Sequence, residues 1–159
     1  MGRKTLELIT AILLTLVTGV FWGTWFSLSR SMHVLSVETF ITIGKQIMEN
    51  VGGPMSILMP ASLICLILLL TASWKTRSLY FYCVLVTFIL FVGALVITLA
   101  VEVPIDNQIR TWTAATAPAD WELIRDRWEW FHTARTFLSL AAISFFVVAL
   151  LNRVRKTNR

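Results

Sequence analysis

The sequence has few charged residues and only two cysteines. Charged residues make up 14% of the 159 positions, against roughly a quarter in a soluble domain, whereas hydrophobic residues make up 57%. Cys65 and Cys83 lie inside apolar runs and form no CxxC or Cys–His cluster, so neither a disulfide framework nor a zinc site is indicated. This composition disfavours a soluble enzyme, a disordered chain and a nucleic-acid-binding domain.

Four apolar runs predict membrane-spanning helices. They cover about residues 6–26, 54–73, 79–101 and 136–151. The fourth run is shorter than the roughly 20 residues that cross a bilayer, so we expect its helix to begin earlier, near Ala119, as a polar helix that then enters the membrane. The sequence predicts one all-α domain over residues 1–159: a four-transmembrane-helix bundle with outer loops at 27–53 and 102–135.

The basic residues predict the orientation of this bundle. Eight of them fall on the side of the two termini: Arg3, Lys4, Lys75, Arg77, Arg153, Arg155, Lys156 and Arg159. Glu7 is the only acidic residue on that side, whereas the other side has six basic and eight acidic residues. The positive-inside rule then places both termini in the cytoplasm. We expect an integral multi-pass protein, in the plasma membrane if the source is bacterial, with membrane lipid around it and no nucleic-acid partner.

The first outer loop is expected to hold a short amphipathic helix. Apolar residues recur at helical spacing over 37–51. The Gly-Gly-Pro sequence at 52–54 is then expected to end this helix and begin the second span. Pro60 leaves two starts open for that span, one at Pro54 with a kink and one near Pro60.

Small residues form a stripe along the first span. Thr15, Gly19, Gly23 and Ser27 recur every four residues, and such a stripe lets a neighbouring helix approach closely. Packing inside the bundle is the expected use. A dimer face is the alternative, so a homo-oligomer stays open.

One face of the long last helix is expected to turn into the bundle. Steps of three and four residues place side chains on one helix face. This spacing joins Arg125, Trp128, His132, Arg135, Ser139, Ala142, Phe146 and Ala149. Cationic residues at the edge of hydrocarbon are costly unless they are paired, snorkelling or functional. We therefore interpret the polar part of this face as the wall of a pocket.

Two polar motifs lie between the third and fourth spans. Val-Pro-Ile-Asp-Asn at 103–107 predicts a turn where the third span leaves the membrane, and Arg127-Trp128, His132 and Arg135 follow about twenty residues on. These motifs resemble the anthrone oxygenase family, with its Pro-Leu/Ile-x-Asn turn and its Arg-Trp-x-x-x-His/Asn-x-x-Arg segment. The resemblance implies a small integral membrane protein and, for some members, oxidation of polycyclic anthrones to anthraquinones by O2.

That chemistry needs a base, donors for an oxyanion and an apolar aromatic slot. An anthrone methylene that loses a proton gives an anion able to react with O2 without a bound metal, so the expectation is no cofactor. By residue type His132 is the expected base. Asn107 and Arg135 are expected to hold the oxyanion.

The remaining polar residues are assigned to binding a hydrophobic small molecule. Trp128 and Trp112 are expected to stack on a flat substrate. Arg127 is expected to pair with Asp106 or another carboxylate and so to order the loop.

Two other interpretations stay open. His33 and His132 are both expected on the outer side, so a bis-histidine haem is one of them. The other is a non-enzymatic bundle, claudin-like or an accessory subunit, whose outer segment binds a partner or lipid. An apolar cavity lined by the site residues favours a ligand site, whereas a filled core with those side chains paired to each other favours a structural role.

Overall fold

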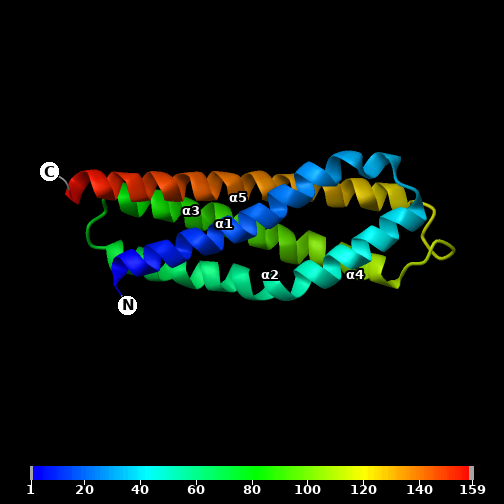
Figure 1. Ribbon diagram of the computed structural model, residues 1–159, viewed down its shortest axis with the longest axis horizontal. Coiled ribbons are helices and arrows are strands. Elements are labelled where there is room, and N and C mark those ends of the chain that lie inside the picture. Colours follow the sequence, from blue (N-terminus) through cyan, green and yellow to red (C-terminus); the bar gives the residue numbers. More distant parts are fainter. Residues whose placement is uncertain (1, 158–159) are drawn as a thin grey trace.

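The computed structural model describes the backbone of residues 2–157 and the side chains of residues 2–153. Arg155, Lys156 and Arg159, which the orientation argument counted, lie outside the described side chains. The elements are α1 (Arg3–Ser27), the 3-10 helix η1 (Ser29–Val34), α2 (Val37–Ser73), α3 (Leu79–Ile97), the π-helical segment η2 (Thr98–Glu102), α4 (Val103–Thr111) and α5 (Trp121–Thr157). Figure 1 shows an elongated bundle with both termini at one end. The opposite end, which carries η1, α4 and the 112–120 loop, is called the distal end below.

Four helical stretches are long and apolar enough to cross a membrane. They are Arg3–Val34, Val37–Ser73, Leu79–Thr111 and Trp121–Arg153. Many of their large apolar side chains point outward, as Ile57 does at 70% exposure and Ile89 at 59%. An outward apolar surface of this extent suits contact with lipid rather than water. The expectation of an all-α protein with four candidate spans is confirmed.

The last helix follows the sequence expectation closely. α5 begins at Trp121, two residues after the expected start, and runs for 37 residues. Every member of the inward stripe is buried, and its deep members Ser139, Ala142 and Phe146 are completely so. The prediction that this face turns into the bundle is therefore confirmed.

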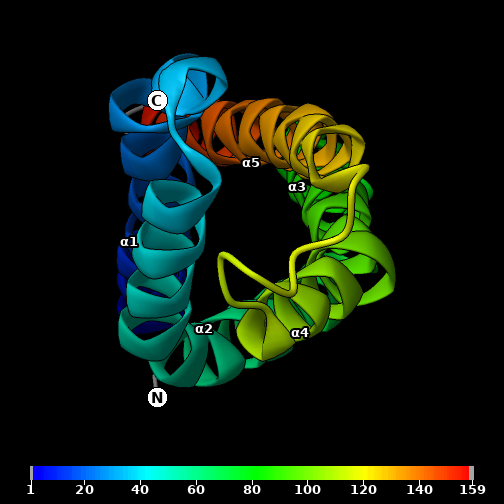
Figure 2. The same cartoon turned by 90° about the vertical axis from the view of Figure 1, so that its right-hand side faces the viewer.

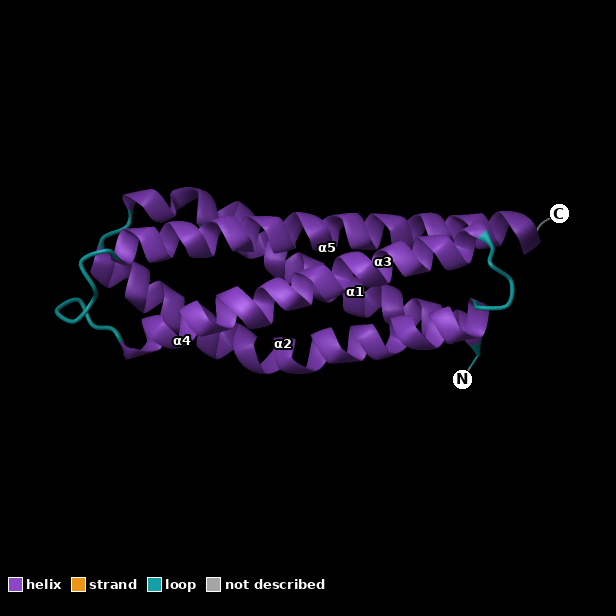
Figure 3. Cartoon of the chain, turned by 180° about the vertical axis from the view of Figure 1, so that it is seen from behind, coloured by secondary structure: helices purple, strands orange, loops and turns teal. Residues whose placement is uncertain are grey.

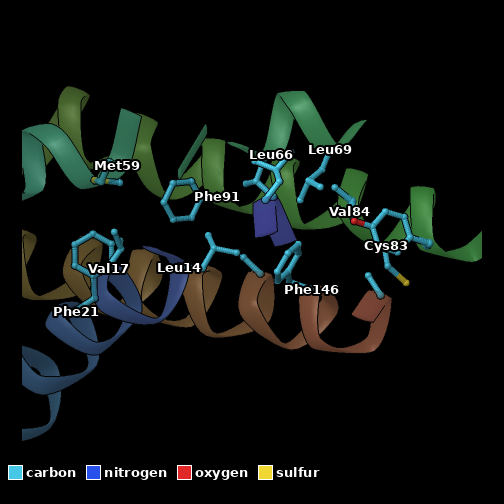
Figure 4. Close-up of a cluster of buried hydrophobic side chains, with 14 of the residues drawn as sticks. Leu14, Val17, Phe21, Met59, Leu66, Leu69, Cys83, Val84, Phe91 and Phe146 are labelled. Atoms are coloured by element: carbon cyan, nitrogen blue, oxygen red, sulfur yellow. The ribbon is translucent and has the colours of Figure 1, made fainter. Parts of the chain in front are cut away.

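The main core lies between the four long helices. Phe146, Phe91, Leu14 and Leu66 are fully buried and gather at its centre (Figure 4). The Thr87 hydroxyl on α3 donates to the Ala142 carbonyl on α5 at 3.1 Å. Polar bonds of this kind join helices where both sides are otherwise apolar.

α2 corrects the prediction for the first outer loop. The short amphipathic helix at 37–51 and the second span are one continuous helix of 37 residues, with Pro54 and Pro60 inside it. Glycine and proline weaken an isolated helix, but tertiary packing outweighs propensity when one face is buried. Met48, Met55 and Met59 supply that buried face. Figure 1 shows α2 bending near its middle, as expected where prolines remove backbone hydrogen bonds.

The turn predicted at Pro104 is also wrong. α3 passes through η2 directly into α4, so residues 103–111 are helical. Pro104 lies two residues after the π-helical segment Thr98–Glu102, and a missing N–H is accommodated where the regular α-helical hydrogen bonding is already interrupted. The chain instead leaves the helix at Trp112 and forms the distal loop at 112–120 (Figure 3).

The small-residue stripe on α1 does not pack inside the bundle. Thr15, Gly19, Gly23 and Ser27 are all exposed. A Cβ atom built on either glycine would meet no atom within 4 Å. The expectation of close packing within the bundle is therefore wrong, and the stripe faces outward.

Candidate functional site

A cavity of about 410 Å³ occupies the distal half of the bundle. Its wall comes from α1, η1, α2, α3, η2, α4 and α5, and it is mostly apolar. Four methionines contribute to it: Met32, Met48, Met55 and Met59. Figure 2, which looks onto the distal end, shows the ring of helices that surrounds this region. The volume lies in the range of small-molecule sites, roughly 300–1,000 Å³.

A buried polar cluster centred on Arg135 forms one side of this cavity. Nη2 of Arg135 lies 2.8 Å from Oε2 of Glu102 and 2.8 Å from Nδ1 of His132. Nε donates to the same Nδ1 at 3.2 Å, and Nη1 donates to the Thr98 hydroxyl at 3.2 Å. The Phe21 ring lies against the guanidinium, 4.5 Å from its carbon. These contacts fix the position of the guanidinium.

The contacts of His132 determine where its proton lies. Arginine only donates hydrogen bonds, so Nδ1 of His132 must be the acceptor and a neutral ring carries its hydrogen on Nε2. Nε2 is buried on the α1 side, near Phe21, and among the described residues it makes no hydrogen bond of good geometry. The only lone pair with which a neutral His132 ring could accept a proton, on Nδ1, is thus engaged by Arg135.

Trp128 links this cluster to α4. Its indole ring stacks on His132, with ring centroids 4.7 Å apart and planes 6° from parallel. Its Nε1–H donates to Oδ1 of Asp106 at 3.0 Å. No described residue makes a hydrogen bond to the other oxygen, Oδ2, and Asp106 lines the cavity. Asp106 therefore contributes to the cavity wall a carboxylate with one oxygen hydrogen-bonded to Trp128 and the other without a hydrogen bond.

The sequence interpretation missed Glu102. Its side chain is fully buried, and Oε2 lies 2.8 Å from Nη2 of Arg135 as an ion pair. Neither of its carboxylate oxygens has a hydrogen-bond partner of good geometry among the described residues. The signal that could have found it was an acid directly after a long apolar run, because ionisable groups within spans are usually paired or functional.

The structure brings together five of the seven predicted site residues. Asp106, Asn107, Trp128, His132 and Arg135 all line the cavity. Trp112 and Arg127 do not.

Trp112 and Arg127 have other surroundings. Trp112 is buried in a second apolar cluster at the distal end, and its carbonyl accepts a hydrogen bond from Lys45 at 2.7 Å. Arg127 is exposed. The expected pairing of Arg127 with Asp106 is replaced by the hydrogen bond that Asp106 accepts from Trp128.

The two histidines do not face one space. His33 on η1 is exposed, with Nε2 3.0 Å from Glu129 and Nδ1 3.7 Å from Asp126 on α5. It ties η1 to α5 and lies outside the cavity that His132 lines. This geometry does not bring His33 and His132 to a common haem site.

Four apolar helices around a ligand-sized cavity, with one polar wall, define a small membrane-type bundle with an internal cavity. Residues 49–145, more than half of the chain, match the family model described as Anthrone oxygenase, so the chain belongs to that family. The match includes the polar wall from Glu102 to Arg135 and confirms the resemblance of the motifs. Neither the curated proteins nor the solved structures gave a match.

Proposed function

We propose that this protein is a membrane oxidoreductase that converts a flat anthrone-type ketone to the corresponding quinone with O2. The observation that carries the proposal is the mostly apolar cavity with its polar groups gathered on α4 and α5. Family membership supports the same reaction class. A slot for a hydrophobic ring system next to a few fixed donors and a carboxylate is what this chemistry requires.

The substrate carbonyl is assigned to Arg135 and Asn107. A guanidinium has five N–H donors. Hydrogen bonds to His132 and Thr98 use three of them, and Nη2 also lies 2.8 Å from Oε2 of Glu102 as an ion pair, so one N–H on Nη1 has no contact among these residues. Asn107 lines the same cavity and offers its side-chain amide. Donors held in place before the reaction stabilise a developing oxyanion without reorganisation.

Asp106 is assigned as the base. Its Oδ2 is available to the cavity, while the bond from Trp128 holds Oδ1 in place. His132, the base expected by residue type, directs its lone pair at Arg135 instead. We assign His132 to positioning: it holds the guanidinium on one side and stacks on Trp128 on the other. The variants described in the Discussion distinguish the two assignments.

The proposed reaction balances without a further reductant. Asp106 accepts one proton from the ring methylene, which leaves an anion conjugated with the carbonyl. O2 takes up electrons from this anion and forms a C–O bond, and the returned proton gives a hydroperoxide. Loss of water breaks the O–O bond and the remaining C–H bond and leaves the second carbonyl. One O2 is consumed for each quinone and each water formed.

The test is turnover of anthrone by the purified protein in lipid vesicles. Under ¹⁸O2 the anthraquinone should carry one labelled oxygen, and the rate should exceed that in protein-free vesicles at the same pH. A rate equal to the protein-free control for anthrone and for its hydroxylated derivatives would overturn the proposal.

For orientation, we propose that the two termini face the cytoplasm, as the distribution of basic residues indicates. Single cysteines at Ser31 and Thr76 test this in a chain whose Cys65 and Cys83 are replaced. A membrane-impermeant maleimide added to intact cells should label position 31 and spare position 76. The reverse pattern would contradict this orientation.

A partner-binding bundle is the second candidate function. The exposed stripe of Gly19 and Gly23 favours it, because small residues permit close approach by another helix. Its partner is then a second copy or another membrane helix. A Gly23→Leu substitution that dissociates a complex isolated in mild detergent would support this candidate.

A further inference from the structure

The cavity residues that are also exposed form two rows. On α2 they are Gly52, Ser56 and Pro60; on the facing η2–α4 stretch they are Leu99, Val103 and Asn107, joined by Arg110. Residues four apart lie on one side of a helix, so each row follows the edge of its helix. Side chains that face both the cavity and the exterior are the two rims of an opening.

The other walls contain no exposed cavity residue. The cavity residues from α1 are buried or half-buried, and Trp128, His132 and Arg135 on α5 are at most 9% exposed. At the distal end α2 and α4 meet, since a Cβ on Gly44 would lie 3.6 Å from Ile109. The opening therefore lies on the lipid-facing flank, nearer the middle of the bundle than the Gly44–Ile109 contact.

Both rims are irregular helix. Pro54 and Pro60 lie inside α2, and Thr98–Glu102 is π-helical on the opposite side. Prolines bend helices, and π segments are rare insertions that often accompany functional sites. The prolines and the π segment thus lie on the two facing helices that carry the rims. From Gly52 to Pro60 the rim is about 12 Å long at 1.5 Å per residue.

The η2–α4 rim is apolar except at its distal end. Leu99 is 60% and Val103 38% exposed, whereas Asn107 and Arg110 lie one and two turns further on. The Arg110 guanidinium reaches across toward α2, where a Cβ on Gly52 would lie 3.8 Å from its Nη2. The apolar part of a ligand can pass between the two rows while its polar group stays near the Arg110 guanidinium. A guanidinium binds acidic oxygens in preference to other polar groups.

We propose that the opening between α2 and η2–α4 is a lateral portal, through which a membrane-dissolved flat aromatic ligand with an acidic oxygen reaches the cavity. The proposal rests on the membrane placement and the ligand class of the proposed function. It adds the route and the residue, Arg110, that selects the polar end of the ligand.

The experiment uses benzophenone, a lipid-soluble diaryl ketone that attaches to nearby C–H bonds when irradiated. Proteoliposomes are mixed with benzophenone-loaded vesicles and flash-irradiated after increasing delays. Mass spectrometry follows adducts on Met55 and Met59, which line the cavity and are at most 9% exposed. The readout requires no turnover, so it is independent of whether the protein oxidises anthrone.

Phenylalanine substitutions on the rims should obstruct the portal. Ser56→Phe and, on the opposite rim, Val103→Phe should each slow adduct formation roughly tenfold, because a restricted route lowers the association rate. Ile57→Phe, beside Ser56 but outside the cavity lining, is the matched control. Gly23→Phe tests the alternative route, because Gly23 lines a groove between α1 and α2 that adjoins the cavity. Both should label at the wild-type rate.

The outcomes that overturn the portal are distinct. Unchanged labelling rates in both rim variants, slowing in Gly23→Phe alone, or no adduct on Met55 and Met59 in the wild type would each do so. If one rim variant fails to reconstitute into vesicles, the other decides. Arg110→Gln tests the selectivity separately: it should lower the labelling rate by benzophenone-4-carboxylate and leave that by benzophenone unchanged, and equal effects on both probes would remove Arg110 from the portal.

Discussion

Glu102 and Arg135 form a buried ion pair, with 2.8 Å between Oε2 and Nη2, that joins η2 to α5. The carboxylate is fully buried, and the guanidinium side chain is 11% exposed. Because the same guanidinium holds His132 and lines the cavity, the ion pair sets the geometry of the polar wall.

Breaking this ion pair should destabilise the bundle. Glu102→Gln leaves the Arg135 charge buried without its counter-charge, which typically costs about 3–5 kcal/mol. The thermal midpoint in detergent should fall markedly for Glu102→Gln and for Arg135→Met. The double variant should lose less than the sum of the two, since paired residues are not additive. Strict additivity would show that the two side chains do not interact.

The contribution of the hydrogen bond from the Trp128 indole to Asp106 should be measurable by itself. Trp128→Phe keeps an aromatic ring against His132 and removes the Nε1–H donor, and a hydrogen bond to a charged group contributes about 1.5–3 kcal/mol. We expect lower stability and weaker binding of anthrone. Trp130→Phe is the matched control, because Trp130 is 68% exposed. Equal effects of the two substitutions would contradict the assigned role.

His132→Gln separates positioning from catalysis. The glutamine oxygen can still accept from Arg135, so turnover should stay within about tenfold of wild type, whereas a lost general base costs roughly 10²–10⁴-fold. His132→Leu should lose substantially more, since it offers no acceptor. If His132→Gln is as inactive as an Asp106 variant, the base is His132.

Phe146 and Phe145 test the core on adjacent positions of α5. Phe146 is completely buried and Phe145 is 42% exposed. Phe146→Ala should lower the unfolding free energy by about 3–5 kcal/mol, the range for buried phenylalanine. Phe145→Ala should cost far less, as measured by denaturant unfolding in the same detergent. A similar loss at both positions would mean that Phe145 is also part of a packed interface.

Much of the fold could be predicted from hydropathy and helical periodicity. The inward stripe from Arg125 to Ala149 required only the 3.6-residue period. The continuity of α2 and of α3 through η2 into α4 could not be predicted, because packing overrides the local signals of Gly52, Pro54 and Pro104. No local signal predicts a π segment, whose extra residue is accommodated by contacts with other helices.

The polar wall was predictable where its residues share one helix. Trp128, His132 and Arg135 lie on α5, so their spacing was sufficient. The partners were not predictable in the same way. Glu102 pairs with Arg135, a residue 33 positions later. The partner of Asp106 is the Trp128 indole and not the expected Arg127. Both relationships depend on how α4 and η2 lie against α5.

Anthrone turnover by Asp106→Asn in lipid vesicles decides whether Asp106 is the base. The amide oxygen can still accept from Trp128, so the cavity should persist and anthrone should bind with affinity close to wild type. The account predicts a loss of quinone formation of about 10²-fold or more. Turnover at the wild-type rate by a correctly folded Asp106→Asn protein would contradict it.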